Sequence, residues 1–286
     1  MIKIGIIGLG SMGTAVLQAI LLSAQKDPTR DSASTHVIAH AKSSPIHESN
    51  IGVSVHSPRS QANADRFQVR TFASNIELVK FSDLVIIAVK PKDIKSTLAP
   101  LKSKLKGKAI LSVAAGYGYD DFANLLDSST RVMVTLPNLA LSVGSGVIGI
   151  GEETTFTKTE REFIAQIFTS SAELVYLPSK LLGALSSLSG SGPAFLALVA
   201  SSMIDAGVKQ GIPHDTATRI VSSTFTGTGM LMEEVFASPD ALKMAVCSPG
   251  GTSIAGIASL EQSGVPGAFI KAIDKTTERF NELAKG

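Results

Sequence analysis

Met1-Ile-Lys-Ile-Gly-Ile-Ile-Gly8-Leu-Gly10-Ser-Met-Gly13 opens the chain as a short apolar strand that runs directly into a Gly-x-Gly-x-x-Gly turn. Residues 14–22 continue with apolar side chains at helical period. In this order the first glycine permits a tight turn, the second lets the backbone approach a pyrophosphate, and the third lets the helix pack closely on the strand. The stretch therefore predicts a Rossmann-type dinucleotide site with contacts from Gly8, Gly10, Ser11, Met12 and Gly13.

The end of the second strand indicates which dinucleotide is bound. We predict this strand at residues 36–41, followed by Lys42, Ser43 and Ser44. An acidic residue at this point usually holds the ribose 2′-hydroxyl of NAD, whereas a basic residue accommodates the 2′-phosphate of NADP. The sequence therefore favours NADP(H) over NAD(H), with Lys42 and Ser43 as contacts. The alternative is that Lys42 is an ordinary solvated lysine.

Composition restricts the class of protein. The chain has 286 residues, which is typical of about two domains, and 44% of them are hydrophobic. A net charge of +2 and the absence of tryptophan leave no basic stripe or stacking platform for nucleic acid. Cys247 is the single cysteine, so an internal disulfide and a cysteine-based metal site are excluded. A reducing compartment, and hence the cytoplasm, is expected.

The first part of the chain alternates strands with helical patterns, which predicts a doubly wound α/β sheet buried on both faces. Between the second strand and Phe72, residues 43–66 are polar, and we predict an extended surface loop there. The histidines in or near this loop lack the close spacing of a metal-ligand pair, so no metal site is expected. Further strands are predicted at 83–89, 109–115, 131–135, 146–150 and 173–177.

After Pro178 only helical patterns remain. We therefore predict a dinucleotide-binding domain over residues 1–178 and an all-helical domain over residues 179–286. The helix at 194–204 is apolar nearly all round, so it must be buried in a core or between subunits. A membrane span is the less favoured interpretation of this stretch. Helices are predicted at 194–209, 213–237, 239–246 and 265–285.

Two glycine- and serine-rich segments are the candidate substrate site, at residues 188–193 and 247–254. Each offers hydroxyls and free backbone amides at the start of a helix, which suits a small carboxylate. The alternative is that both are plain capping turns. No His and Asp couple accompanies them, so the hydride acceptor should already be activated, as a protonated imine is and an alcohol is not.

The chain resembles the pyrroline-5-carboxylate reductase family over nearly its whole length. The likeness rests on motifs in a fixed order, namely Gly8-Leu-Gly-Ser-Met-Gly13, Ala88-Val-Lys-Pro91, Ser112-Val-Ala-Ala-Gly116, Leu188-Ser-Gly-Ser-Gly-Pro193, Asp205-Ala-Gly-Val208 and Ser248-Pro-Gly-Gly-Thr-Ser-Ile-Ala-Gly256.

This resemblance implies an NADPH-preferring enzyme that reduces a cyclic imine carboxylate to proline, the last step of proline synthesis. It implies a helical dimerisation domain that interlocks with a second subunit, as a homodimer or a dimer-based higher oligomer. The implied further cofactor contacts are Asn75, Val89, Lys90, Pro91, Ala114, Ala115 and Gly116. The implied substrate contacts are Ser189, Gly190, Ser191, Ser248, Gly251, Thr252 and Ser253, with the Ser253 hydroxyl as the catalytic group that binds the ring nitrogen.

Departures from the family pattern leave alternatives open. Ser253 stands where the family usually has threonine, Cys247 where it has Ser or Thr, and Met244 where it has Asp. Aligning Pro137 and Asn138 with the family's Pro-Asn pair moves Arg131 out of register. These changes allow a related substrate, such as the six-membered piperideine carboxylate. A β-hydroxyacid-type dehydrogenase would need a catalytic lysine, for which Lys180 and Lys209 are candidates by location only. A non-catalytic NADP-binding protein is the remaining alternative.

Overall fold

The computed structural model describes residues 1–25 and 46–285, which form two compact units. The first contains residues 1–190 together with 277–286, and the second contains residues 191–276. The chain thus leaves the first unit after Gly190 and returns to it at Thr277. The functional boundary predicted at residue 178 stays a prediction.

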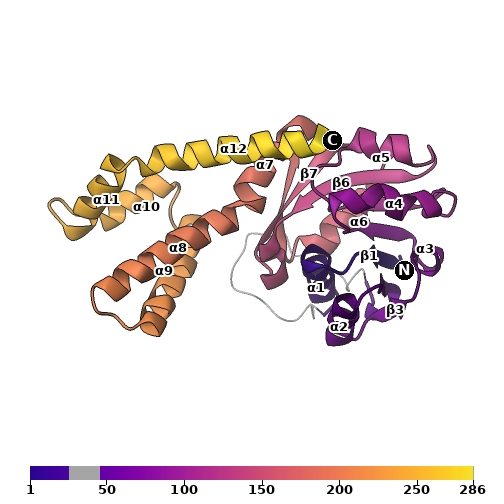
Figure 1. The fold of residues 1–286 in the computed structure, drawn as a ribbon, viewed down its shortest axis with the longest axis horizontal. Coiled ribbons are helices and arrows are strands. Elements are labelled where there is room, and N and C mark those ends of the chain that lie inside the picture. Colours follow the sequence, from indigo (N-terminus) through magenta and orange to yellow (C-terminus); the bar gives the residue numbers. More distant parts are fainter. Residues whose placement is uncertain (26–45, 286) are drawn as a thin grey trace. The chain divides into compact units, whose positions relative to one another are not determined.

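The described part of the first unit is built around one eight-stranded sheet with the order β3-β2-β1-β4-β5-β6-β7-β8 (Figure 1). Neighbouring strands from β3 to β6 are parallel, β6 and β7 are antiparallel, and β7 and β8 are again parallel. The predicted doubly wound sheet is confirmed, as are the five strands predicted after residue 80. The strands are β1 (Ile4–Ile7), β2 (Ile51–Ser54), β3 (Arg70–Phe72), β4 (Leu84–Ile87), β5 (Ala109–Ser112), β6 (Arg131–Pro137), β7 (Gly146–Thr154) and β8 (Ala172–Leu177).

Helices cover both faces of the sheet because its central strands are apolar on both sides. One hydrophobic cluster joins Ile4, Ile6 and Ile51 to α1, α2 and α6, and the other joins Ile7 and Val85 to α3, α4, α5 and α7. The helices are α1 (Ser11–Gln25), α2 (Pro58–Phe67), α3 (Asn75–Phe81), α4 (Ile94–Leu98), α5 (Tyr119–Leu125), α6 (Lys158–Phe168) and α7 (Leu182–Leu185). Short helical turns are η1 (Glu48–Asn50), η2 (Pro91–Asp93), η3 (Ala99–Leu101), η4 (Leu139–Val143), η5 (Ser179–Leu181) and η6 (Ser186–Gly190).

The prediction of a loop over residues 43–66 is wrong for its described part. This segment contains η1, the buried strand β2 and most of α2. The polar composition suggested a loop because α2 is a surface helix, in which only Ser60 and Ala64 are buried, and because β2 has just four residues. The strand predicted at 36–41 lies outside the described residues; in the described chain the outer neighbour of β1 is β2.

The second unit is helical, as predicted, and contains α8 (Gly192–Lys209), α9 (His214–Glu234), α10 (Pro239–Val246), α11 (Thr252–Gln262) and the first part of α12 (Val265–Lys285). The described chain by itself does not bury α8: Leu196 is 53% exposed and Leu198 is 69% exposed. Of the two predicted ways to bury this helix, in a core or between subunits, only burial between subunits remains.

Candidate cofactor and substrate sites

The glycine turn after β1 has the geometry of a dinucleotide cradle. Gly8 has a φ of +98°, and a Cβ there would lie 2.7 Å from the backbone carbonyl of Ala88. A Cβ at Gly13 would collide with the Gly8 carbonyl oxygen, whereas one at Gly10 would meet nothing within 4 Å. Two glycines are thus required by packing and one faces open space. This difference fits a turn whose middle glycine is kept clear for a phosphate.

Backbone pairing brings three of the predicted cofactor segments to one edge of the sheet. The Ala88 N–H donates to the Ile7 carbonyl at 2.8 Å, and the Val113 N–H donates to the Ile87 carbonyl at 3.1 Å. The glycine turn, residues 89–91 and residues 114–116 therefore follow adjacent parallel strands at their carboxyl ends. Ligands of open α/β sheets bind at this edge, at the point where the strand order changes direction. In this sheet that point lies between β1 and β4.

Helix α2 is attached to the glycine turn, which the sequence did not predict. The Arg59 guanidinium donates to Ser11 Oγ at 3.2 Å, and the Asn63 amide donates to the Leu9 carbonyl at 2.9 Å. The Ser57 side chain caps the helix, with Ser60 in a capping box. The end of β2 and the start of α2 are therefore held beside the predicted pyrophosphate site.

The turn between β2 and α2 occupies the place that the sequence analysis gave to Lys42 and Ser43. Those two residues lie outside the described part of the chain, so their predicted role is untested. Arg59 is a further candidate that sequence reasoning missed. Its signal was the run Val53 to Arg59, in which a short β-branched strand precedes Ser57-Pro58, a typical helix start.

Asn75 begins α3 next to this turn. Its Oδ1 lies 2.9 Å from His56 Nε2. The side chain of His56 is exposed and that of Asn75 is partly exposed. The structure thus joins the predicted cofactor residue Asn75 to one of the histidines for which the sequence predicted no metal site.

The first candidate substrate segment is shaped by η6. Asn138, which is 6% exposed, donates from Nδ2 to the Ser189 carbonyl at 3.1 Å and accepts the Val147 N–H at 3.0 Å. Ser189 Oγ donates to the Leu185 carbonyl at 3.0 Å. Asn138 therefore fixes the backbone of Ser189, another role that the sequence did not predict. Ser189 and Gly190 belong to the first unit and Ser191 to the second.

The second segment precedes α11 in the helical unit. The Gly251 N–H donates to the Ser248 carbonyl at 3.0 Å, and a Cβ on Gly251 would lie 2.5 Å from Ser248 Oγ. Gly251 caps α11 without a side chain, so the helix geometry leaves the amides of Thr252, Ser253 and Ile254 without intrahelical partners. The free amides thus begin at Thr252, and the Gly251 amide is already engaged.

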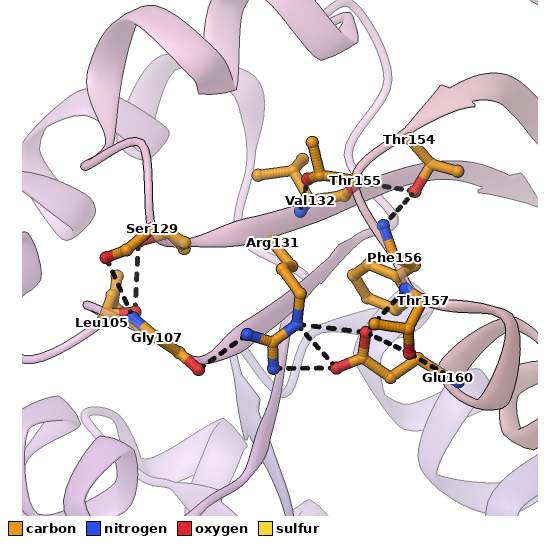
Figure 2. A network of polar contacts seen from close by, with 11 residues as sticks. Leu105, Gly107, Ser129, Arg131, Val132, Thr154, Thr155, Phe156, Thr157 and Glu160 are labelled. Carbon is orange, nitrogen blue, oxygen red and sulfur yellow. Dashed lines mark hydrogen bonds and ion pairs between the residues drawn. The ribbon is translucent and has the colours of Figure 1, made fainter.

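Within the first unit, Arg131 lies at the opposite edge of the sheet from Asn138, which contacts the first segment. It begins β6, whereas Pro137 ends that strand, so Arg131 is at the amino edge of the parallel sheet and Asn138 follows the carboxyl edge. Figure 2 shows Arg131 between Glu160 and the Gly107 carbonyl. These contacts give Arg131 a structural role, because they join β6 to α6 and to the loop before β5.

The cradle and the strand edge beside it define an oxidoreductase that binds a nicotinamide dinucleotide. Residues 3–116 match the family described as NADP oxidoreductase, coenzyme F420-dependent, and residues 179–283 match the family described as pyrroline-5-carboxylate reductase dimerisation.

The chain belongs to the pyrroline-5-carboxylate reductase family. It is 33% identical to the pyrroline-5-carboxylate reductase of Methanosarcina acetivorans, over 99% of this chain and 98% of that protein. The enzyme of the same name from Arabidopsis thaliana is 30% identical, over 99% of this chain and 96% of that protein. The structure of a pyrroline-5-carboxylate reductase from Coxiella burnetii is 26% identical, with a TM-score of 0.82, 100% of this chain and 99% of that chain covered. The chain is accordingly an oxidoreductase of the class that acts on a C=N bond, and it carries a dimerisation domain.

Proposed function

We propose that this protein reduces 1-pyrroline-5-carboxylate to L-proline with NADPH as the preferred electron donor. The observation that supports this reaction is that one chain of this family contains both an intact glycine cradle and the Ser248–Ser253 segment. The bound nicotinamide supplies a hydride to the imine carbon.

The residues of the second segment bind and orient the imine. The amides of Thr252 and Ser253 at the start of α11 hold the substrate carboxylate, helped by the positive end of the helix. The Ser253 hydroxyl binds the ring nitrogen and keeps the imine carbon toward the cofactor. Ser248 shapes the loop by accepting the Gly251 N–H at its carbonyl. Ser189, Gly190 and Ser191 are proposed as further substrate contacts.

The preference for NADPH rests on Arg59 in this proposal. Its guanidinium is exposed and forms no ion pair with any described carboxylate, and residues 55–59 contain no Asp or Glu. Arg59 stands at the start of α2, where a basic side chain accommodates a 2′-phosphate. Lys42 remains a second candidate for the same phosphate.

Self-association accounts for the exposed apolar helices. The helical stretch Ser179–Lys209 is long and apolar enough to cross a membrane by length and composition, and 22% of its most apolar window is buried. This stretch opens the region that matches the dimerisation family. We infer that a second copy of the chain covers it and that no membrane is needed; placement in the cytoplasm stays a prediction.

One assay tests the proposed reaction. NADPH consumption is followed with pyrroline-5-carboxylate and, in parallel, with piperideine carboxylate, with NADH as the control donor. Faster turnover of the five-membered imine with NADPH supports the proposal. Preference for the six-membered ring would assign the enzyme to that substrate, which the departures at Ser253, Cys247 and Met244 allow. Consumption of neither imine would contradict the proposed reaction.

Three variants test the residue assignments. Ser253→Ala is expected to lower kcat/KM for the imine by about 10-fold or more while the NADPH affinity stays unchanged. Arg59→Ala is expected to raise the KM for NADPH and to leave the KM for NADH unchanged. If Lys42→Ala has this effect and Arg59→Ala does not, the 2′-phosphate contact belongs to Lys42.

A further inference from the structure

We propose that His56 positions the side chain of Asn75 for the 2′-phosphate end of the cofactor and so contributes to the choice between NADPH and NADH. This inference rests on the proposed NADPH preference. It concerns a residue outside the family motifs, at the end of β2.

The hydrogen bond between the two side chains fixes the orientation of both. An amide oxygen can only accept, so His56 Nε2 carries the proton that is donated to Asn75 Oδ1 over 2.9 Å. The Asn75 amide group then presents its two N–H donors away from the histidine. No described residue accepts a hydrogen bond from Asn75 Nδ2, so both donors remain for a ligand.

The backbone on each side of this contact is held in place. The His56 and Ser57 N–H groups both donate to Ser60 Oγ, at 3.1 and 3.0 Å. On the other side, the Ser74 hydroxyl caps α3 by accepting the Glu77 N–H at 3.2 Å. The His56 to Asn75 contact therefore joins two anchored turns, and loss of the imidazole frees the Asn75 amide to rotate.

A buried hydroxyl lies close in the fold and has no protein partner. Ser54 ends β2, is 2% exposed, and its Oγ forms no hydrogen bond within the described residues. Side chains alternate along a strand, so Ser54 shares a face with Gly52, where a Cβ would meet Phe72, Leu78 and Phe81. This is the face that α3 covers, and Asn75 begins α3. The end of β2 and the start of α3 are therefore held together by the packing of this face.

The charge of this turn suits an anion. Arg59 supplies the fixed positive charge, while Asn75 supplies oriented neutral donors. In this arrangement Arg59 attracts the phosphate and the His56 to Asn75 pair adds directional hydrogen bonds to it. A cofactor without the 2′-phosphate offers only a neutral hydroxyl at that position, which is a weaker acceptor than the charged phosphate, so the contribution of His56 is larger for the phosphorylated dinucleotide.

Calorimetric titration of the purified full-length protein with adenosine 2′,5′-bisphosphate and with 5′-AMP separates these contributions without turnover. His56→Phe keeps an aromatic ring and removes the donor. It is expected to weaken binding of the bisphosphate by roughly 3- to 10-fold, the range for one hydrogen bond, and to weaken binding of 5′-AMP, which has only a neutral 2′-hydroxyl, clearly less. His56→Gln keeps an N–H donor and should restore at least half of the lost binding free energy. In an Asn75→Ala background, His56→Phe should have no further effect. The thermal midpoint of each variant serves as the control for folding.

The outcomes distinguish this inference from the proposed function. Equal losses for both ligands, an unchanged bisphosphate affinity in His56→Phe, no recovery with Gln, or an undiminished effect in the Asn75→Ala background would each overturn the role of His56. Arg59→Ala is titrated alongside. If Arg59→Ala weakens the bisphosphate and His56→Phe does not, only the inference about His56 fails; if neither variant nor Lys42→Ala weakens it, the proposed NADPH preference fails as well.

Discussion

The guanidinium of Arg131 binds the carboxylate of Glu160 through two nitrogens, with Nε 2.8 Å and Nη2 2.8 Å from Oε1 (Figure 2). The same carboxylate accepts the N–H of Thr157 at 2.8 Å and so also caps α6. Burial raises the pKa of Glu160, but the hydrogen bonds from Thr157 and Arg131 outweigh it, and the pKa lies below its usual value. One acidic group thus joins β6 to the start of α6.

Glu160→Gln is expected to reduce the free energy of unfolding by about 1 kcal/mol at neutral pH, since glutamine retains the cap and loses the ion pair. Because the folded pKa is depressed, this stabilisation is present above the usual pKa of glutamate and is lost as the pH falls through the folded value. The wild type and the variant should therefore converge in acid denaturation curves. Glu162→Gln, whose carboxylate lies 3.9 Å from Lys158 on the same helix, is the control and should change little. A constant difference at every pH would contradict the assigned ion pair.

Gly8 and Gly10 of the cradle should respond differently to alanine. Gly10→Ala meets open space, so the thermal midpoint should stay near that of the wild type while NADPH affinity falls. Gly8→Ala should unfold the protein at lower temperature, because its φ of +98° and the Ala88 carbonyl both oppose a Cβ. Thermal unfolding and cofactor titration of the two variants separate the effects. Wild-type NADPH affinity in Gly10→Ala would show that the phosphate lies elsewhere.

Asn138→Asp tests the contact that shapes the Ser189 turn. Aspartate keeps an acceptor for the Val147 N–H but replaces the donor to the Ser189 carbonyl with a carboxylate oxygen. We expect a loss of about 2 kcal/mol in unfolding free energy and a higher KM for the imine. Asn50→Asp is the control, since within the described residues the side-chain amide of Asn50 donates only to Met1 Sδ. An unchanged KM would show that the turn does not contact the substrate.

Gly183→Ala tests the packing of the C-terminal helix. A Cβ at Gly183 would lie 3.0 Å from Phe280 Cδ1 and 3.1 Å from Asn281 Oδ1. We expect a destabilisation of about 1 to 3 kcal/mol, as for other overpacked sites, measured by denaturant unfolding. Gly227→Ala in α9, where a Cβ meets nothing within 4 Å, is the matched control. Equal stability of both variants would contradict a tight contact at Gly183.

Much of the fold could be predicted because its signals are local. Strands such as β4 and β5 are unbroken apolar runs between polar boundaries, and the spacing of the three glycines predicts the turn after β1. The short strand β2 was not predicted, because four residues in a polar segment show too little hydrophobic periodicity. Helix α11 was predicted only at its start, because the glycine and serine content of the segment gives a weak helical signal.

The candidate site was predictable only where a motif carried it. Arg59, His56 and Asn138 owe their positions to partners 48, 19 and 51 residues away, namely Ser11, Asn75 and Ser189. No local pattern encodes such pairs, because they depend on how strands are ordered in the sheet. The sequence also could not predict which backbone amides of the second candidate segment are free, since only the folded turn shows that the Gly251 N–H is bound to the Ser248 carbonyl.

The return of the chain from the helical unit has a consequence for synthesis. Thr277 Oγ1 lies 2.8 Å from Ser187 Oγ, and Phe280 packs against the cluster that contains Leu182. The last turns of α12 thus complete a unit whose remainder is encoded before residue 191. A ribosome delivers these turns after residues 191–276, so the dinucleotide-binding unit cannot finish folding until the whole helical unit has been translated.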